Sequence, residues 1–270
     1  MSARNPATAL AEVLVDELVR GGLHHALVAP GSRSTPLALA LHAHPQIRLH
    51  VELDERSAAF CALGIGRATG RPAAVLSTSG TAAVNFHPAV VEADAARVPL
   101  LVLTADRPPE LRETGANQTI DQTRLYGGAA RWSGELGVAE RRDGAARYWR
   151  SVAARALAVT VGAPVGPVHL NVAFREPLVP SGSDWPEPLA GRSSGRAWTE
   201  RAAEPRSASL TDLRWLSERL RAVRRGVVVL GDGVRDAAPL RRLAETFGWP
   251  LLAEPQSGGR CGEHAISTYD

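Results

Sequence analysis

Three short polar segments each follow a hydrophobic run and precede a stretch with helical periodicity. They cover residues 30–34 (Pro-Gly-Ser-Arg-Ser), 53–56 (Leu-Asp-Glu-Arg) and 78–81 (Thr-Ser-Gly-Thr). In an open parallel α/β sheet, ligands bind outside the carboxyl ends of the strands, so loops after successive strands face one crevice. The sequence therefore predicts a ligand site at these loops, with Glu55 as its candidate carboxylate.

Glu55 has two interpretations. It begins a predicted helix directly after a predicted strand, where the helix dipole favours a carboxylate, and acidic residues are common in the first turn of any helix. The functional interpretation is that Glu55 is partly buried. Loss of solvation would then favour its protonated form and let it share a proton with a ligand nitrogen.

Two arginines follow strands of the same predicted sheet. Arg33 comes after the first strand and Arg107 after the fourth. A guanidinium can hold a carboxylate or phosphate through two parallel hydrogen bonds, although a single arginine after a turn is commonplace at any surface. Two arginines at strand ends of one sheet indicate a substrate with more than one carboxylate.

Hydroxyl and amide groups complete the candidate set. Residues 78–81 offer hydroxyls and backbone N–H groups at a helix start, which suits a polar ligand and equally a plain helix cap. Asn117 and Gln118 lie in a loop without periodicity, where their amides could contact a cofactor or substrate or could close backbone hydrogen bonds. Both interpretations stay open at each position.

Alternating hydrophobic runs and helical patterns would position these residues. Strands are predicted at 25–29, 47–51, 73–77, 100–104 and 167–172. Helices are predicted at 6–21, from 35 onward, and at 54–68, 82–95 and 145–161. Apolar strands that alternate with helices are typical of an α/β fold whose parallel sheet is covered on both faces.

The periodicity ends near residue 176 in a stretch rich in Pro, Gly and Ser. We expect a first domain over 1–180, a linker over 181–208 and the start of a second α/β domain over 209–270. Within that second part, helices are predicted at 210–220 and 237–247, and strands at 226–230 and 250–253. About 60 residues are few for an independent core, so we expect this second domain to be truncated.

Composition narrows the class of protein. The chain has 270 residues, 44% of them hydrophobic, and a net charge of +3, and its basic residues are all arginines without a clustered basic face, which argues against nucleic-acid binding. Two distant cysteines suit neither a disulfide framework nor a zinc site, and the histidines form no metal pattern. Cys61, in an apolar helix, is predicted to be buried. Without a signal sequence or an apolar run of roughly 18 residues, the sequence predicts a soluble cytoplasmic protein that does not span a membrane.

Five motifs occur together in a specific order. They are Ala-Pro-Gly-Ser-Arg-Ser-Thr-Pro-Leu at 29–37, Asp-Glu-Arg-Ser-Ala at 54–58, Thr-Ser-Gly-Thr-Ala at 78–82, Leu-Thr-Ala-Asp-Arg-Pro-Pro-Glu-Leu at 103–111 and Gly-Ala-Asn-Gln at 115–118. This set resembles the MenD family of thiamine-diphosphate enzymes. The resemblance implies a pyrimidine-binding domain over 1–180, followed by the beginning of the central domain. It also implies a homodimer with each active site between two subunits.

The resemblance further implies an activity. Members are carbon–carbon bond-forming transferases of menaquinone biosynthesis that decarboxylate 2-oxoglutarate and add the resulting succinic semialdehyde carbanion to isochorismate. Glu55 would be the catalytic residue that hydrogen-bonds the aminopyrimidine ring of thiamine diphosphate and promotes loss of the thiazolium C2 proton. By the same resemblance, Pro30, Thr81 and Asn117 would also contact the cofactor. The substrate residues would be Ser32, Arg33, Arg107 and Gln118.

One part of the family pattern is missing. Members hold Mg²⁺ or Mn²⁺ and the diphosphate with a Gly-Asp-Gly loop followed about 25 to 30 residues later by Asn, because a hard cation needs oxygen ligands. Residues 231–233 read Gly-Asp-Gly, but the last asparagine is Asn171, so we interpret them as a turn. We therefore expect no metal ligands here and no catalysis by this chain alone. The alternatives are another thiamine-diphosphate decarboxylase or ligase, or a non-catalytic ligand-binding module.

Overall fold

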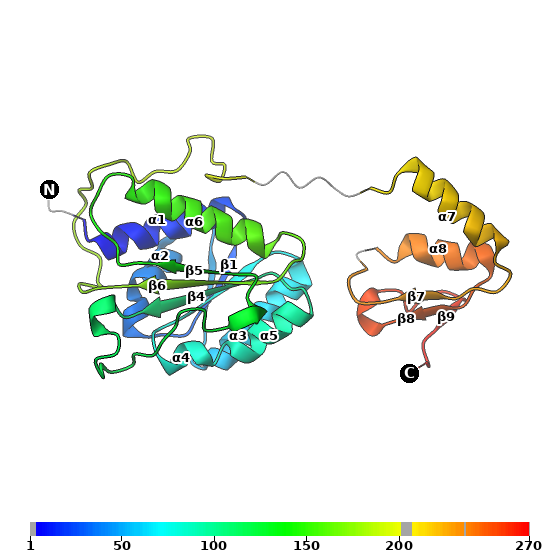
Figure 1. Ribbon diagram of the computed structural model, residues 1–270, viewed down its shortest axis with the longest axis horizontal. Helices are drawn as coiled ribbons and strands as arrows, with labels where there is room; N and C mark the ends of the chain where they lie inside the picture. Colours follow the sequence, from blue (N-terminus) through cyan, green and yellow to red (C-terminus); the bar gives the residue numbers. More distant parts are fainter. Residues whose placement is uncertain (1–3, 201–206, 235, 270) are drawn as a thin grey trace. The chain divides into compact units, whose positions relative to one another are not determined.

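The computed structural model of the protein describes residues 4–200, 207–234 and 236–269 (Figure 1). The chain divides into two compact units, Met1–Ala202 and Ala203–Asp270. In the first unit, hydrophobic runs of the sequence become neighbours in a six-stranded parallel sheet with the order β2-β1-β3-β4-β6-β5. The strands are β1 (His25–Val28), β2 (Arg48–Val51), β3 (Ala73–Ser77), β4 (Leu100–Asp106), β5 (Trp132–Leu136) and β6 (Pro167–Ala173).

Helices cover both faces of this sheet (Figure 1). One face carries α1 (Pro6–Arg20), α2 (Thr35–Ala43) and α6 (Ala145–Thr160), and the other carries α3 (Glu55–Thr69), α4 (Thr81–Val84) and α5 (His87–Ala95). Successive strand residues alternate between the two cores: Ala74 and Leu76 pack in the first, Ala73 and Val75 in the second. This double burial explains why the strands read as continuous apolar runs, and it confirms the predicted α/β class.

The ends of α3 follow from local chemistry. Asp54 caps the helix by accepting a hydrogen bond at Oδ1 from the backbone N–H of Ser57, at 2.8 Å. Gly70 ends the helix with φ of +65°, a conformation that glycine adopts without a side-chain penalty. These two signals are readable in the sequence, and they fix Glu55 as the first helical residue.

Cys61 is exposed, so the prediction that it is buried was wrong. The apolar side of α3 is made by Ala58, Ala59, Ala62 and Leu63. Cys61 lies between these positions on the outward side of the helix. Average apolarity of the helix predicted burial, whereas the helical period decides which face a residue occupies.

Two elements differ from the sequence expectation. The helix predicted at 82–95 is two helices, α4 and α5, because Pro88 stands in the first turn of α5 and its ring disfavours a continuous helix. β5 is not predicted at all. It pairs only with β6, at the sheet edge, and its partly polar sequence carries no continuous apolar run.

Much of the segment predicted to be a linker, 181–208, contacts the first unit. The Glu187 carboxylate accepts hydrogen bonds from the backbone N–H groups of Gly144 and Ala146 at the start of α6, at 3.0 and 2.9 Å. Arg150 donates to the carbonyl of Leu189 at 2.6 Å. Hydrogen bonds to the start of α6 and from Arg150 therefore hold a stretch that composition alone describes as irregular.

The second unit contains a small parallel sheet with the order β7-β8-β9. Its elements are α7 (Leu210–Ala222), β7 (Val228–Leu230), α8 (Ala238–Phe247), β8 (Leu251–Ala253) and β9 (Ala265–Ile266). Residues 232–233 form a turn after β7, as interpreted from the sequence, and Gly233 has φ of +103°. Among the helices of the described residues, none is long and apolar enough to cross a membrane.

Candidate functional site

The carboxyl ends of β2, β1, β3 and β4 lie side by side along one edge of the sheet. The register pairs Val28 with Val51 and with Leu76, and Ser77 with Thr104. The loops after these strands carry Pro30, Ser32, Arg33, Glu55, Thr81 and Arg107. The predicted shared edge is thus confirmed.

Arg33 is buried at the end of β1, in the 3-10 helix η1 (Ser32–Ser34). It donates from Nη1 to the carbonyl of Phe174 at 2.9 Å, and Nη2 lies 3.4 Å from the Glu176 carboxylate. Its buried Nε has no partner among the described residues. Burial lowers the pKa of Arg33, the nearby positive charge of Arg107 lowers it further, and the charges of Glu176 and Asp106 oppose the shift.

Arg107 anchors the loop that carries the two amides. Its Nε and Nη2 donate to the carbonyl of Asn117 at 3.3 and 3.1 Å. Because Arg33 and Arg107 are close enough to repel, an anion bound beside both would relieve that repulsion. The structure therefore brings together the two arginines that the sequence selected as a pair.

A close contact joins Gly80 to Gln118. Gly80 has φ of +83°, and a Cβ atom there would lie 2.9 Å from Cγ of Gln118 and 3.0 Å from its carbonyl oxygen. The Ser79 hydroxyl donates to that same carbonyl at 2.9 Å. Only glycine fits this position, so the loop after β3 and the amide loop meet directly.

Sequence reasoning missed a buried polar cluster behind these loops. Asp106 accepts hydrogen bonds from its neighbour Arg107 N–H at 2.7 Å, from Arg112 at 2.8 Å and from Asn171 Nδ2 at 2.9 Å. Gln122 and Thr104 both donate to Asn171 Oδ1, at 2.9 and 2.8 Å. Signals existed in the sequence, since Asp106 and Asn171 are polar residues in otherwise apolar strands.

Arg112 joins this cluster to the surface. Its Nη2 also contacts the Glu135 carboxylate at 2.5 Å. Burial opposes a charged guanidinium here, but the Glu135 and Asp106 carboxylates outweigh it and raise the pKa of Arg112. The loop after β4 is therefore fixed at both its backbone and its side chains.

Four candidate residues are placed at the surface of this edge. Pro30, Ser32 and Thr81 are exposed, and Glu55 is partly buried, as its functional interpretation requires. Within the described part of the chain, the Glu55 carboxylate makes no hydrogen bond or ion pair. It is therefore available to a ligand.

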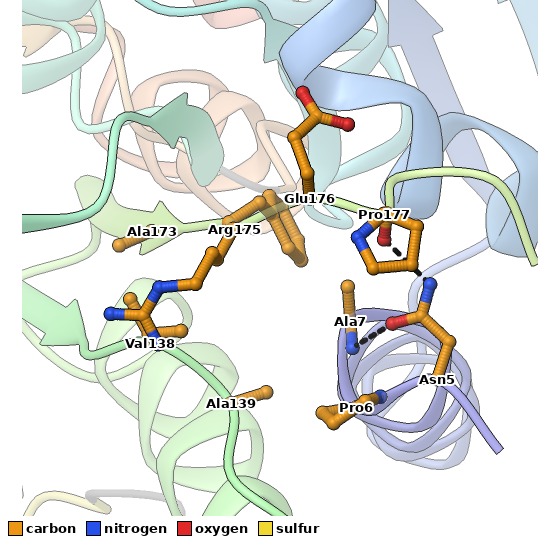
Figure 2. A pocket seen from close by; sticks show the side chains of 10 residues that line it. Asn5, Pro6, Ala7, Val138, Ala139, Ala173, Arg175, Glu176 and Pro177 are labelled. Atoms are coloured by element: carbon orange, nitrogen blue, oxygen red, sulfur yellow. Dashed lines mark hydrogen bonds between the residues drawn. The ribbon is translucent and has the colours of Figure 1, made fainter. Parts of the chain in front are cut away.

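A hollow of about 130 Å³ lies beyond the end of β6. Its lining includes Asn5, Val138, Phe174 and Arg175, and Figure 2 shows Asn5 bonded both to the N–H of Ala7 and to the carbonyl of Pro177. None of the residues selected from the sequence lines this hollow. It adjoins the edge where the candidate residues gather, because Phe174 and Glu176, which line it, also contact the Arg33 guanidinium.

No group of three or more His, Cys, Asp or Glu in the described ranges could hold a metal ion.

His169 offers a pH test of the buried cluster. Burial lowers the pKa of His169 to about 4, and its Nε2 lies 2.7 Å from Thr104 Oγ1. Since the unfolded chain takes up a proton near pH 6.5 and the folded chain does not, stability should fall as pH drops from about 6.5 toward about 4. We expect the ring to titrate near pH 4 by NMR, with His169→Gln assigning the resonance. A midpoint near 6.5 would contradict this buried placement.

One protein family matches part of the first unit. Residues 8–125 match the family described as the thiamine pyrophosphate enzyme, N-terminal TPP binding domain. The match contains the loops after β1, β2, β3 and β4, together with Asn117 and Gln118. It therefore covers every candidate site residue selected from the sequence.

Curated relatives are similar to nearly the entire chain. Proteins named 2-succinyl-5-enolpyruvyl-6-hydroxy-3-cyclohexene-1-carboxylate synthase are 57% identical in Thermobifida fusca, 53% in Saccharopolyspora erythraea and 47% in Geobacillus kaustophilus. These alignments cover 98%, 98% and 96% of this chain, and 47%, 47% and 46% of the respective relatives. The chain spans about half the length of the curated relatives it matches.

Proposed function

Because this chain carries the amino-terminal domain of thiamine-diphosphate enzymes and is homologous to the MenD family over nearly its whole length, we propose that it forms the cofactor-activating part of such a synthase. The complete reaction would decarboxylate 2-oxoglutarate and add the remaining four-carbon unit to isochorismate, in menaquinone biosynthesis. The observation that carries this proposal is the arrangement of Glu55, Arg33 and Arg107 at one sheet edge, inside the matched region.

The residues at this edge fit the ring end of thiamine diphosphate. Glu55 has a carboxylate without a protein partner in the described ranges, and Thr78 Oγ1 is buried without one. Gly31 lies against Thr78 so closely that a Cβ atom would be 2.4 Å from Thr78 Cβ, so glycine lets the loops after β1 and β3 pack together at this edge. Glu55, Pro30, Thr81 and Asn117 would hold the cofactor. When bound, thiamine diphosphate supplies an acidic carbon that attacks a 2-oxo acid once it loses its proton.

Each side chain then has a physical task. Glu55 would hold or move a proton at a nitrogen of the aminopyrimidine ring. Arg33 and Arg107 bind carboxylates, and both proposed substrates are dicarboxylates. Ser32 and Gln118 lie on the same edge and would orient the bound substrate through a hydroxyl and an amide.

The remaining parts of the site would come from elsewhere. Mg²⁺ or Mn²⁺ would need oxygen ligands that bind the diphosphate, and we assign these to residues outside this chain. We propose a cytoplasmic homodimer whose active site lies between the subunits. We also propose that 1–180 acts as the pyrimidine-binding domain, that 181–208 connects it to the next domain, and that 209–270 begins the central domain.

A substrate comparison tests this function. The full-length protein, supplied with thiamine diphosphate and Mg²⁺, should release CO₂ from 2-oxoglutarate and form product only when isochorismate is present. Release of CO₂ from pyruvate but not from 2-oxoglutarate would favour a different thiamine-diphosphate decarboxylase. Binding of either dicarboxylate with no CO₂ release under any condition would instead favour a non-catalytic module.

A further inference from the structure

We infer that Gln122 is a positioning residue, which fixes the loops of the candidate site relative to one another without touching a ligand. The side chain is only 1% exposed. Its place in the fold is the segment directly after Asn117 and Gln118. The inference rests on the proposed function only for what the loops bind, since the arrangement of the loops themselves is structural.

One carboxamide joins three parts of the fold. Gln122 Oε1 accepts a hydrogen bond from the backbone N–H of Gly80 at 2.8 Å, in the loop after β3. Its Nε2 donates to the carbonyl of Ala105 in β4 at 3.1 Å and to Oδ1 of Asn171 in β6 at 2.9 Å. The Oε1 and Nε2 atoms of Gln122 therefore bond groups that lie behind the candidate site.

The partners on each side determine how the amide is oriented. Gly80 presents a donor, while Ala105 and Asn171 present acceptors. Asn171 Oδ1 is itself fixed as an acceptor because Asn171 Nδ2 donates to the Asp106 carboxylate. A group with one acceptor and two donors is required, and among common side chains a primary amide provides it.

Through these hydrogen bonds, Gln122 positions two loops that carry candidate site residues. Thr81 follows Gly80 directly, and Gln118 is attached to the same turn by the Ser79 hydroxyl. Asn117 is attached to β4 by Arg107, next to the carbonyl that Gln122 bonds. If the hydrogen bonds of Gln122 to Gly80 and Ala105 are lost, the loops that carry Thr81, Asn117 and Gln118 are no longer held in fixed positions relative to one another.

Replacement of Gln122 by Glu tests this arrangement at nearly constant shape. A carboxylate has no donor and a protonated carboxyl group has only one, so at least one of the two acceptors, on Ala105 and Asn171, would lose its hydrogen bond. In the full-length protein we expect the KM for 2-oxoglutarate or isochorismate to rise about tenfold, which corresponds to about 1.4 kcal/mol of binding, while kcat changes much less. Amide hydrogen exchange should also become faster in peptides that cover 78–84 and 115–120.

Two further variants separate positioning from stability. Thr160→Val removes an equally buried hydroxyl that donates to the carbonyl of Ala156 at 2.8 Å, near the opposite edge of the sheet. It should lower Tm without changing KM or exchange at 115–120. Ser79→Ala removes only the bond to Gln118, and it should reproduce a smaller part of the KM and exchange effects even if Gln122→Glu does not fold.

The outcomes are distinct. Unchanged exchange at 115–120 in a folded Gln122→Glu protein, or in Ser79→Ala when the former does not fold, would overturn the inference. A rise in KM in Thr160→Val equal to the rise in Gln122→Glu would also overturn the inference. If the native protein acts on neither dicarboxylate, the proposed function fails, and the exchange measurement then decides alone whether Gln122 positions these loops.

Discussion

Replacement of Glu55 by Gln in the full-length protein should slow proton loss from the acidic carbon of thiamine diphosphate by at least about 100-fold, the scale of a positioned proton-transfer group. Glu55 begins α3 at the edge where the strands end, and it is partly buried without a protein partner in the described ranges. Glutamine keeps the size and polarity of the side chain but cannot exchange a proton with the aminopyrimidine ring. The rate is measured by hydrogen–deuterium exchange of the bound cofactor, followed by NMR after rapid quenching.

Glu52→Gln is the matched control. Glu52 lies in the same strand-to-helix loop and is also partly buried, so its replacement changes the local charge equally. We expect the exchange rate in this variant to stay within about threefold of the native rate, since no proton transfer is assigned to Glu52. An unchanged rate in Glu55→Gln, or an equal loss in both variants, would remove Glu55 from the proton-transfer step.

The second large effect is expected at Arg107. Replacement by Gln should raise the KM for the dicarboxylate substrate about 10-fold to 100-fold, because charge-assisted hydrogen bonds contribute roughly 1.5–3 kcal/mol. Arg107 is close enough to Arg33 for the two charges to repel, and the loss of one charge would weaken the proposed dicarboxylate site. Arg107→Lys keeps the charge without the planar fork, so it should recover only part of the affinity.

Arg175→Gln controls for the loss of an arginine at a neighbouring strand end. Arg175 bonds the Glu110 carboxylate through Nε and Nη2 at 2.5 and 2.8 Å, and this pairing lowers the pKa of Glu110 to about 2. Its guanidinium is therefore already committed to a protein partner. KM should stay near the native value in this variant. Equal KM values for Arg107→Gln and the native protein would show that Arg107 does not bind the dicarboxylate.

Local signals in the sequence account for much of the fold. β3 occupies the predicted residues 73–77, because an apolar run in a doubly covered sheet is read directly. α3 was predicted within one residue of each end, because an Asp cap and a closing glycine are short-range signals. Pro88 is a sequence signal for the break before α5. The prediction of one helix over 82–95 gave more weight to the helical periodicity than to this proline.

What could not be predicted depends on contacts between distant residues. β5 is a strand because β6 offers a pairing edge, and its own sequence gives little sign of it. Glu187 holds its segment against α6 through backbone groups that are 41 and 43 residues away. Residues rich in Pro, Gly and Ser therefore read as a linker, although the tertiary structure fixes them.

The candidate site divides in the same way. The loops were predictable, because strand ends of a parallel sheet share an edge, and this applies to Arg33 and Arg107 together. The polar groups behind them were only partly predictable. Asn171 stands out as a polar residue in an apolar strand, but Gln122 is recognised as its partner only when the fold brings Gln122 Nε2 within 2.9 Å of Asn171 Oδ1. The role proposed for each candidate residue comes from the family resemblance, because strand ends predict a residue's position and not its ligand.

A crystal structure of the full-length protein with thiamine diphosphate, Mg²⁺ and 2-oxoglutarate would test the central claim most directly. We predict the Glu55 carboxyl group within about 2.6–3.2 Å of a nitrogen of the aminopyrimidine ring, which is hydrogen-bond reach. We also predict a substrate carboxylate on Arg107 or Arg33. A pyrimidine ring bound away from Glu55, or a substrate that contacts neither arginine, would contradict the assignment of this sheet edge as the catalytic site.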